Sequence, residues 1–389
     1  MRTTYVAPLT GETGKETPRK TLTPYGSPDT SAKQVRTDIL LVGFDFGTTT
    51  SCLKATFAGS DELVVNEILP TIVGYVREGI VENLLPGNAR LLFGAEAMKN
   101  RLYLRLVSPM ADGVIADPQA AQDFARHLRQ LLKSPQGAEL RAVIGIPANA
   151  ERAAQESLSQ AVTGLFDKVL LIPEPFLAAL GYRDEARLGD PTYLDPVRNS
   201  LFVDIGAGTT SVCLVQGYFP SGDDQMSIPF AGDKVDLLLH EAIARIYPDI
   251  TLSLIKVREI KEQHSYVGKL DAPVSVNLVI GGKMRKLDVG ESIGKSCEML
   301  LQRVFESVKT IIAQASNDSV ADLMQNIIVT GGGSRIRNMD AELQRLLVED
   351  GYEKPRVLSV GEDYKELVAK GALVAARQAK EGQWQTLAP

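Results

Sequence analysis

Cysteine and histidine are scarce in this chain of 389 residues, which contains three of each. The cysteines Cys52, Cys213 and Cys297 are odd in number and widely spaced, so they predict neither a disulfide framework nor a metal cluster. The histidines are equally far apart, which argues against a zinc site. Unpaired cysteines are typical of a reducing compartment, and we expect a cytoplasmic location.

Long apolar runs are also missing. No stretch of the chain reaches the ~18–20 apolar residues that a membrane-spanning helix needs. The N-terminus lacks the apolar segment of a secretory signal, so we expect no direct insertion into a membrane. The net charge of −6 at pH 7 gives no general attraction to nucleic acid or anionic lipid, and we expect no nucleic-acid partner.

Two stretches about 160 residues apart have nearly the same sequence pattern, at 40–51 and 201–211. Each is an apolar run, then an aspartate (Asp45 or Asp204), then a turn of glycine and threonine. Glycine lets backbone N–H groups approach a phosphate closely, and the threonine hydroxyls add donors. An aspartate beside a phosphate requires a cation between them, which favours Mg²⁺.

One such loop could equally be an ordinary hairpin turn, but the matched pair predicts a duplicated fold that binds a nucleotide's phosphates from both sides. The chain has no GxxxxGK[ST] motif, which excludes a P-loop. The glycines of the second loop lead into a strand rather than a helix, which argues against a Rossmann dinucleotide site.

Three further features could complete a nucleotide site. Glu174 lies between two prolines where a strand meets a helix, so it could orient a water or a metal-bound water, or simply favour the helix dipole. The glycines at 331–333 leave room for a flat ring or a ribose. Arg258 and Lys261 share a helix face that Glu262 borders. They could cover a purine and hydrogen-bond a ribose, although a solvated charged face is the plainer interpretation.

Strands that alternate with helices predict an α/β fold, and the length suggests roughly two domains. We expect a disordered basic tail at 1–37 and a polar tail at 381–389. The first domain is predicted at 38–199, with a small lobe at about 66–112 and completion by 366–380. The second is predicted at 200–365, with a small lobe at about 233–289. Residues 183–199 are expected to form a surface loop or hairpin between them.

In this order the motifs resemble those of the actin/Hsp70/sugar-kinase superfamily, over about residues 38–380. The resemblance rests on phosphate loops at 43–50 and 203–211, connecting segments at 144–182 and 369–372, and an adenosine motif at 328–337. A finer resemblance, carried mainly by 261–268, is to bacterial actin-like filament proteins of the magnetosome cytoskeleton. It implies an actin-like fold, with two duplicated ribonuclease-H-like α/β domains around a central nucleotide cleft.

The resemblance also implies a role for each site residue. Asp45 would hold Mg²⁺ through water, and Glu174 and Asp204 would position the metal and the hydrolytic water. The remaining residues would bind ATP, with the phosphates at Gly47, Thr48, Thr49, Gly206, Ala207, Gly208 and Thr209 and the nucleoside at Arg258, Lys261, Glu262, Gly331, Gly332, Gly333 and Arg335.

The implied function is that of a Mg²⁺-dependent ATPase whose subunits assemble head to tail into cytoskeletal filaments. Such filaments would organise magnetosomes, with magnetosome-associated proteins as further partners. The alternative is an Hsp70-like chaperone ATPase without a peptide-binding domain, which the stretch 43–52 also fits. A sugar kinase would need a catalytic aspartate over a hydroxyl substrate, and the sequence offers no convincing candidate. The sequence leaves the choice between ATP and GTP open.

Overall fold

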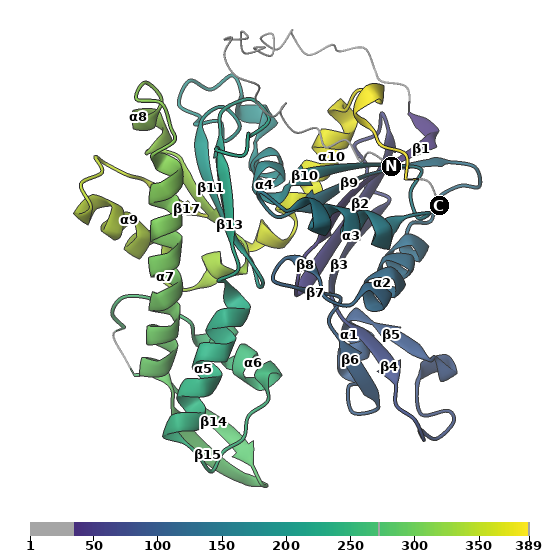
Figure 1. The fold of residues 1–389 in the computed structure, drawn as a ribbon, viewed down its shortest axis with the longest axis vertical. Helices are drawn as coiled ribbons and strands as arrows, with labels where there is room; N and C mark the ends of the chain where they lie inside the picture. Colours follow the sequence, from purple (N-terminus) through teal and green to yellow (C-terminus); the bar gives the residue numbers. More distant parts are fainter. Residues whose placement is uncertain (1–34, 271–272, 388–389) are drawn as a thin grey trace.

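The computed structural model describes residues 35–270 and 273–387, and two α/β halves face each other across a cleft (Figure 1). Most of the expected N-terminal tail, residues 1–34, lies outside the described residues, as do the last two residues of the expected C-terminal tail. Among the described residues, no helix is both long enough and apolar enough to cross a membrane.

The first half contains a five-stranded sheet in the order β10-β9-β1-β2-β3. Its strands are β1 (Arg36–Phe46), β2 (Thr50–Ala58), β3 (Val65–Pro70), β9 (Glu139–Ile146) and β10 (Lys168–Pro173). Helices α2 (Pro118–Leu131) and α3 (Arg152–Val162) belong to this half, with a short hairpin of β7 (Met110–Ala111) and β8 (Val114–Ile115). The central strands are almost entirely buried, which is why they are continuous apolar runs in the sequence.

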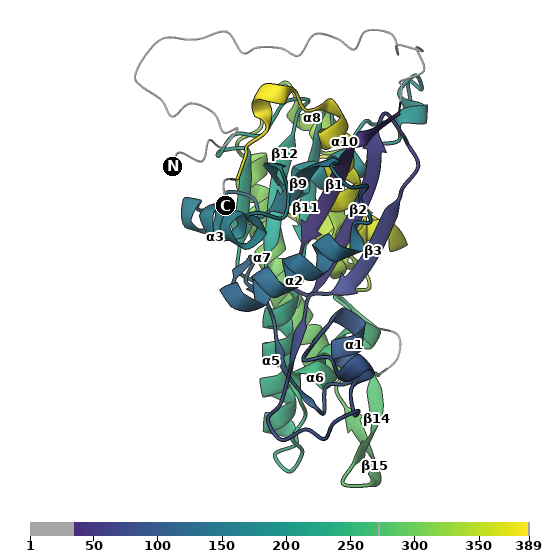
Figure 2. The ribbon, with the colours of Figure 1, turned by 90° about the vertical axis from the view of Figure 1, so that its right-hand side faces the viewer.

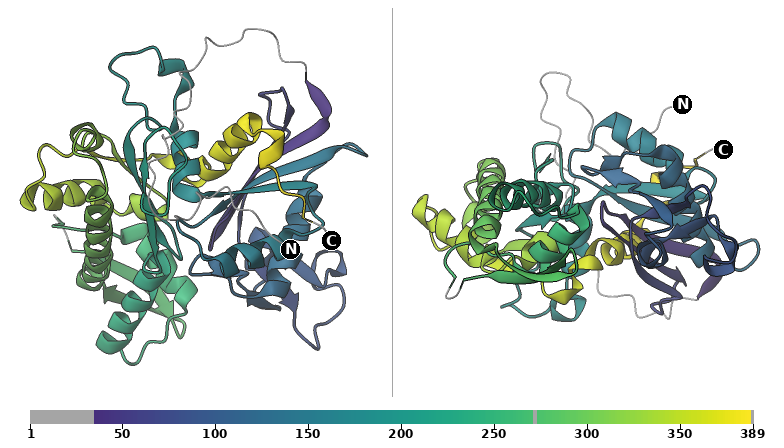
Figure 3. Two further views of the ribbon diagram at one scale, coloured as in Figure 1. Left: turned by 45° about the horizontal axis from the view of Figure 1, so that its top comes forward. Right: turned by 90° about the horizontal axis from the view of Figure 1, so that it is seen from below.

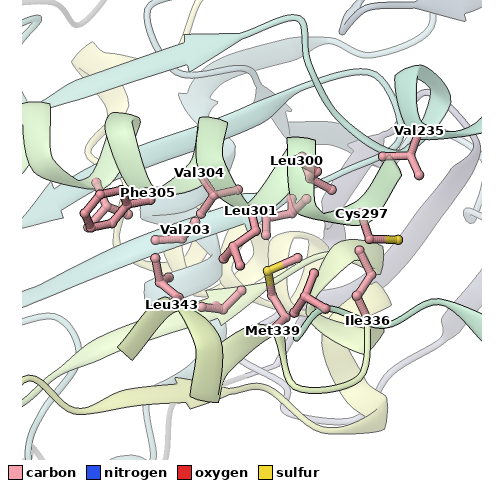
Figure 4. Packing of buried hydrophobic residues seen from close by; sticks show 14 of the residues in the cluster. Val203, Val235, Cys297, Leu300, Leu301, Val304, Phe305, Ile336, Met339 and Leu343 are labelled. Atoms are coloured by element: carbon pink, nitrogen blue, oxygen red, sulfur yellow. The ribbon is translucent and has the colours of Figure 1, made fainter. Parts of the chain in front are cut away.

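The second half repeats this plan with a sheet in the order β13-β12-β11-β16-β17. Its strands are β11 (Ser200–Ile205), β12 (Thr210–Val215), β13 (Gln225–Ile228), β16 (Ile327–Thr330) and β17 (Val357–Ser359). Its helices include α7 (Gly290–Ile312), α8 (Val320–Leu323) and α9 (Met339–Glu349). Strand β13 was not predicted. Figure 4 shows the core between these layers, where Leu301 of α7 and Met339 of α9 pack with Val203 of β11.

The duplication extends to the strand pairing. In the first half β1 pairs antiparallel with β2 and parallel with β9. In the second half β11 pairs antiparallel with β12 and parallel with β16. Each glycine–threonine loop therefore joins the first two strands of its own sheet, and both loops lie at corresponding positions.

A small lobe extends from each half, toward the lower end of the molecule in Figures 1 and 2. The first has three strands and a short helix: β4 (Val73–Val76), β5 (Leu91–Phe93), β6 (Leu104–Val107) and α1 (Gly94–Lys99). The expected start at about residue 66 differs from the structure, because β3 pairs with β2 in the main sheet. The second lobe contains α5 (Gly232–Ile246), α6 (Leu254–His264) and a hairpin of β14 (Ser275–Ile280) and β15 (Lys283–Asp288).

Two helices join the halves, α4 (Glu174–Tyr182) and α10 (Leu367–Gln378), and both contribute to a core that also contains Val143 of the first sheet and Phe202 of the second. Both views of Figure 3 show α10, in yellow, between the halves. The two helices touch through glycine. A β-carbon built on Gly371 would lie 1.8 Å from the carbonyl oxygen of Leu177.

Residues 381–387, expected to be a polar tail, pack against the first half. A 3₁₀ turn, η5 (Glu381–Gln383), leads to Gln385, which exchanges backbone hydrogen bonds of 2.8 and 3.0 Å with Val169 of the edge strand β10. Trp384 packs on the core between the halves, and Leu387 on the core of the first half. This C-terminal segment therefore covers one edge of the first sheet.

The loop at 183–199 is ordered by its own ion pairs. Arg183 donates to Asp195, with both side chains largely buried. The Tyr193 hydroxyl accepts a hydrogen bond from the backbone N–H of Asp184, and the Arg187 guanidinium lies over the Tyr193 ring. The expected surface loop is thus present, with a short 3₁₀ turn, η2 (Glu185–Arg187), rather than a hairpin.

Candidate functional site

The cleft between the two halves encloses about 390 Å³ and contains every residue that the sequence predicted for a nucleotide site. The first half contributes the β1–β2 loop and Glu174 at the start of α4. The second half contributes the β11–β12 loop, α6 and the 3₁₀ turn η3 (Gly332–Arg335). The structure therefore brings together residues that are far apart in the chain, while the role of each residue stays a prediction.

The two glycine–threonine loops face each other closely. A β-carbon built on Gly208 would lie 2.6 Å from the hydroxyl oxygen of Thr48, so a larger residue at 208 would collide with the opposite loop. Hydrogen bonds fix the backbone of both loops. The Thr71 hydroxyl donates to the carbonyl of Gly47 at 2.7 Å, and the backbone N–H of Asp233 donates to the carbonyl of Ala207 at 2.8 Å.

Three carboxylates lie at the base of the cleft: Asp45, Glu174 and Asp204. Removal of water, together with the charge of Asp204, raises the pKa of Asp45 to about 8. Loss of water raises the pKa of Asp204 to about 6. Burial, together with the negative charges of Asp45 and Asp204, raises the pKa of Glu174 well above its usual value. Without a cation the three groups cannot all be ionised at neutral pH.

This donor set suits a hard cation such as Mg²⁺, which prefers oxygen ligands and keeps several of its waters. Among the described residues, no group of three His, Cys, Asp or Glu side chains could hold a metal ion directly. The carboxylates therefore fit a cation held partly through water, as the sequence predicted for Asp45, and less well a site of three direct protein ligands.

Arg258 and Lys261 of α6 do not form a solvated charged face. Lys261 is largely buried, and its Nζ donates to the carbonyl of Gly232 at 2.8 Å and lies 2.7 Å from Oδ1 of Asp236. Arg258 donates from Nε to Asp236 at 2.8 Å and from Nη2 to Asp233 at 2.7 Å. Both cations line the cleft while bound on their other side to carboxylates of α5.

The glycines after β16 form the floor of the cleft, and the backbone geometry explains why they are glycines. Gly331 has φ +76°, a conformation that favours glycine, and its β-carbon would lie 2.4 Å from Oδ1 of Asp204. A β-carbon on Gly333 would lie 2.2 Å from the side chain of Ile205. Arg335, at the end of this turn, forms an ion pair with Glu362.

Sequence reasoning missed several residues of the cleft. Tyr364 and Lys365 reach it from the 3₁₀ turn η4 (Glu362–Lys365) just before α10, and no local motif marks them. Asp233 lies at the first turn of α5 and also lines the cleft. The spacing of Asp233 and Asp236 matches that of Arg258 and Lys261, since both pairs are three residues apart on a helix. That match was an available signal for their pairing.

Comparison with known proteins places this arrangement among actin-like proteins. The family profile described as "MreB/Mbl protein" matches residues 41–382. The actin-like protein MamK of Paramagnetospirillum magneticum is 31% identical over 79% of this chain and 84% of its own length. MamK of Magnetospirillum gryphiswaldense is 33% identical over 78% of this chain and 80% of its own length.

Solved structures give the same result. A MamK double helical filament superposes with a TM-score of 0.78 at 29% identity, covering 88% of this chain and 99% of that one. A non-polymerising MamK mutant bound to AMPPNP superposes with a TM-score of 0.62 at 29% identity, covering 87% and 98%. The predicted actin-like fold and the predicted resemblance to bacterial actin-like filament proteins are confirmed.

The chaperone likeness is weaker. The chaperone protein HscA homologue of Shewanella oneidensis is 26% identical, and this chain covers 58% of its length. Such a partial match is expected when two proteins share a nucleotide-binding fold but differ elsewhere, since a shared fold does not imply a shared function.

Proposed function

Since this chain belongs to the MreB/Mbl protein family, we propose that it binds and hydrolyses ATP with Mg²⁺ and assembles into cytoskeletal filaments. One observation carries the proposal: two matching Asp–Gly–Thr loops, one from each half, face each other across a cleft lined by carboxylates and by a glycine floor. Two such loops that line one cleft are suited to hold a phosphate chain from both sides.

In this proposal the phosphates lie between the loops, near Thr48 and Thr49 and the backbone at 206–209. Asp45 would hold water bound to the metal. Glu174 and Asp204 would orient the attacking water, since a carboxylate within reach can accept its proton. When bound, Mg²⁺ would neutralise charge on the phosphate oxygens. Because phosphoryl transfer depends mainly on positioning and electrostatics, these carboxylates suffice for slow hydrolysis.

The nucleoside would extend toward the glycine floor and the α6 wall. Gly332 and Gly333 would lie beneath the adenosine, with Glu262 at the ribose. We propose ATP rather than GTP because a MamK mutant that superposes on this chain was solved with AMPPNP, an analogue of ATP.

The proposal extends to assembly. The MamK double helical filament supports self-polymerisation of this chain. We propose head-to-tail contacts, because heterologous contacts of this kind build open filaments. Loss of the terminal phosphate would remove contacts that join the two halves. Hydrolysis would therefore let the halves separate and weaken the filament. We further propose a cytoplasmic filament that positions magnetosomes, with magnetosome-associated proteins as partners.

Phosphate release from Mg-ATP by the purified full chain tests the enzymatic part. Asp204→Ala should abolish release, and undiminished turnover in this variant would refute the assignment of Asp204. Glu174→Ala should slow release while filaments still form and persist. A chaperone ATPase would behave differently from a filament protein. Peptide should stimulate its hydrolysis of ATP, and the protein should form no polymer that pellets.

A further inference from the structure

Asp236 is a buried carboxylate behind the wall of the cleft, and the proposed function gives it no role. It lies on α5, is 2% exposed and does not line the cleft. Its Oδ2 accepts a hydrogen bond from Nε of Arg258 at 2.8 Å. Its Oδ1 lies 2.7 Å from Nζ of Lys261 in an ion pair without hydrogen-bond geometry. Both of its partners line the cleft.

A carboxylate buried this completely requires compensation, because taking an ion out of water costs several kcal/mol unless it is paired. Here two carboxylates of α5 face two cations of α6. Asp236 contacts both cations, whereas Asp233 contacts only Arg258. The formal charges cancel within the cluster, so this wall offers N–H donors without a net positive charge.

The ammonium of Lys261 lies near the second phosphate loop. A β-carbon built on Gly232 would lie 3.3 Å from Nζ of Lys261 and 3.4 Å from Cα of Ala207 in the second phosphate loop. The lysine ammonium is therefore close to the phosphate loop but bound to Asp236 and to the carbonyl of Gly232. A flexible lysine released from those partners could reach the phosphates as a point charge.

We propose that Asp236 is a positioning residue for nucleotide recognition. It holds Lys261 and Arg258 against the wall, so that they contact the base and ribose and do not act as phosphate ligands. Selectivity for a nucleotide over a bare phosphate chain then follows from this tether. The inference rests on the proposed function, because it concerns the same cleft and the same ligand.

The test compares Mg-ATP with inorganic tripolyphosphate in the presence of Mg²⁺, by calorimetric titration of the full chain. Asp236→Asn should weaken Mg-ATP binding about tenfold, the usual scale for a lost charged hydrogen bond. It should leave tripolyphosphate binding equal or tighter, so that the ratio of the two affinities falls by about tenfold or more. Glu259→Gln is the matched control. Glu259 lies on α6, beside the cations that Asp236 holds, but its carboxylate is exposed and pairs with Lys256.

Lys261→Gln provides a second test that does not depend on the stability of the Asp236 variant. It should weaken Mg-ATP binding and leave tripolyphosphate binding unchanged. In the double variant, loss of Lys261 should remove any gain in tripolyphosphate binding. A fall in tripolyphosphate binding as large as that for Mg-ATP in Lys261→Gln would make Lys261 a phosphate ligand and overturn the proposal.

The remaining outcomes are also decisive. If Asp236→Asn weakens both ligands equally, Asp236 merely joins α5 to α6 and the proposal is wrong. If the wild-type protein binds tripolyphosphate but shows no preference for Mg-ATP, the proposed function fails together with this inference. If the wild type prefers Mg-ATP and the ratio is unchanged in Asp236→Asn, only this inference fails.

Discussion

Thr48 and Gly208 belong to different halves of the protein, yet a β-carbon on Gly208 would lie 2.6 Å from the Thr48 hydroxyl oxygen. It would also lie 2.9 Å from the backbone nitrogens of Asp112 and Gly113. Backbone atoms cannot swing aside as the end of a side chain can. Glycine at 208 is therefore a requirement for the close approach of the two loops.

Gly208→Ala should consequently hold the loops apart and weaken Mg-ATP binding by at least about tenfold, the scale on which misplaced contacts act. Calorimetric titration measures this directly. Gly189→Ala is the control, since no atom lies within 4 Å of the β-carbon it would add. Equal affinities for the two variants would show that the loops do not need to close on the ligand.

Gly371→Ala is expected to destabilise the whole molecule, because its β-carbon would lie 1.8 Å from the carbonyl oxygen of Leu177. Forcing α4 and α10 apart is an overpacking defect of about 3 kcal/mol, near the upper end of the usual range. Urea unfolding gives the free energy change. Gly382→Ala adds a methyl group into open space and should leave stability unchanged. Similar midpoints for the two variants would contradict the tight helix contact.

Stability without divalent cations should depend on pH through Asp45. In the folded protein the pKa of the Asp45 carboxyl is raised to about 8, whereas in the unfolded chain this carboxyl loses its proton at about pH 4. Between these values the folded state binds a proton that the unfolded state has lost, so the free energy of unfolding falls as the pH rises.

Asp45→Asn cannot lose a proton, so its free energy of unfolding should rise relative to that of the wild type between about pH 5 and about pH 8. The slope of the difference should not exceed about 1.4 kcal/mol per pH unit, the value for one proton. Urea titrations in EDTA measure it. A difference that stays constant across this window would mean that the Asp45 carboxyl titrates normally.

The C-terminal segment should be held by packing rather than by its ion pairs. Glu381 accepts from Arg141 and Lys168 but is mostly exposed, and exposed pairs contribute about 0–1 kcal/mol. Trp384 is partly buried against the core between the halves. Trp384→Ala should therefore cost about 2 kcal/mol, below the range for a fully buried aromatic, and Glu381→Gln should cost clearly less, because water screens its ion pairs. Urea unfolding followed by circular dichroism measures both changes, and the reverse ranking would contradict this balance.

The parts of the fold that sequence could predict were those encoded locally. The apolar run at 39–44 could only be a buried strand, and the glycine–threonine turns carry their own chemistry. Strand β3 was predicted as part of the small lobe rather than of the main sheet. Only Val65 in it is buried, so its sequence lacks the pattern of a sheet strand. The packing of the segment at 381–387 was not predicted for a different reason. Its hydrogen-bond partner Val169 is more than 200 residues away in the chain, so no local pattern indicates the contact.

The site shows the same division. The residues proposed for the cleft all lie there. The glycine and threonine residues belong to short motifs with recognisable turns, whereas Arg258, Lys261 and Glu262 lie on helix α6 and were assigned to the site only through the resemblance. Asp236 and Lys365 belong to no such motif. No local pattern marks Lys365. The spacing of Asp233 and Asp236 matches that of Arg258 and Lys261, but only the packing of α5 beside α6 brings the two pairs together.

Pelleting of the full chain with Mg-ATP, beside a sample in which EDTA replaces Mg²⁺, tests the central claim most directly. In the proposed function the two halves close on one nucleotide, and MamK, whose structure superposes on this chain, was solved as a double helical filament. We therefore predict sedimenting polymer and rising light scattering with Mg-ATP above a threshold protein concentration, and little of either with EDTA. A protein that remains monomeric with Mg-ATP at every concentration up to its solubility limit would contradict this account.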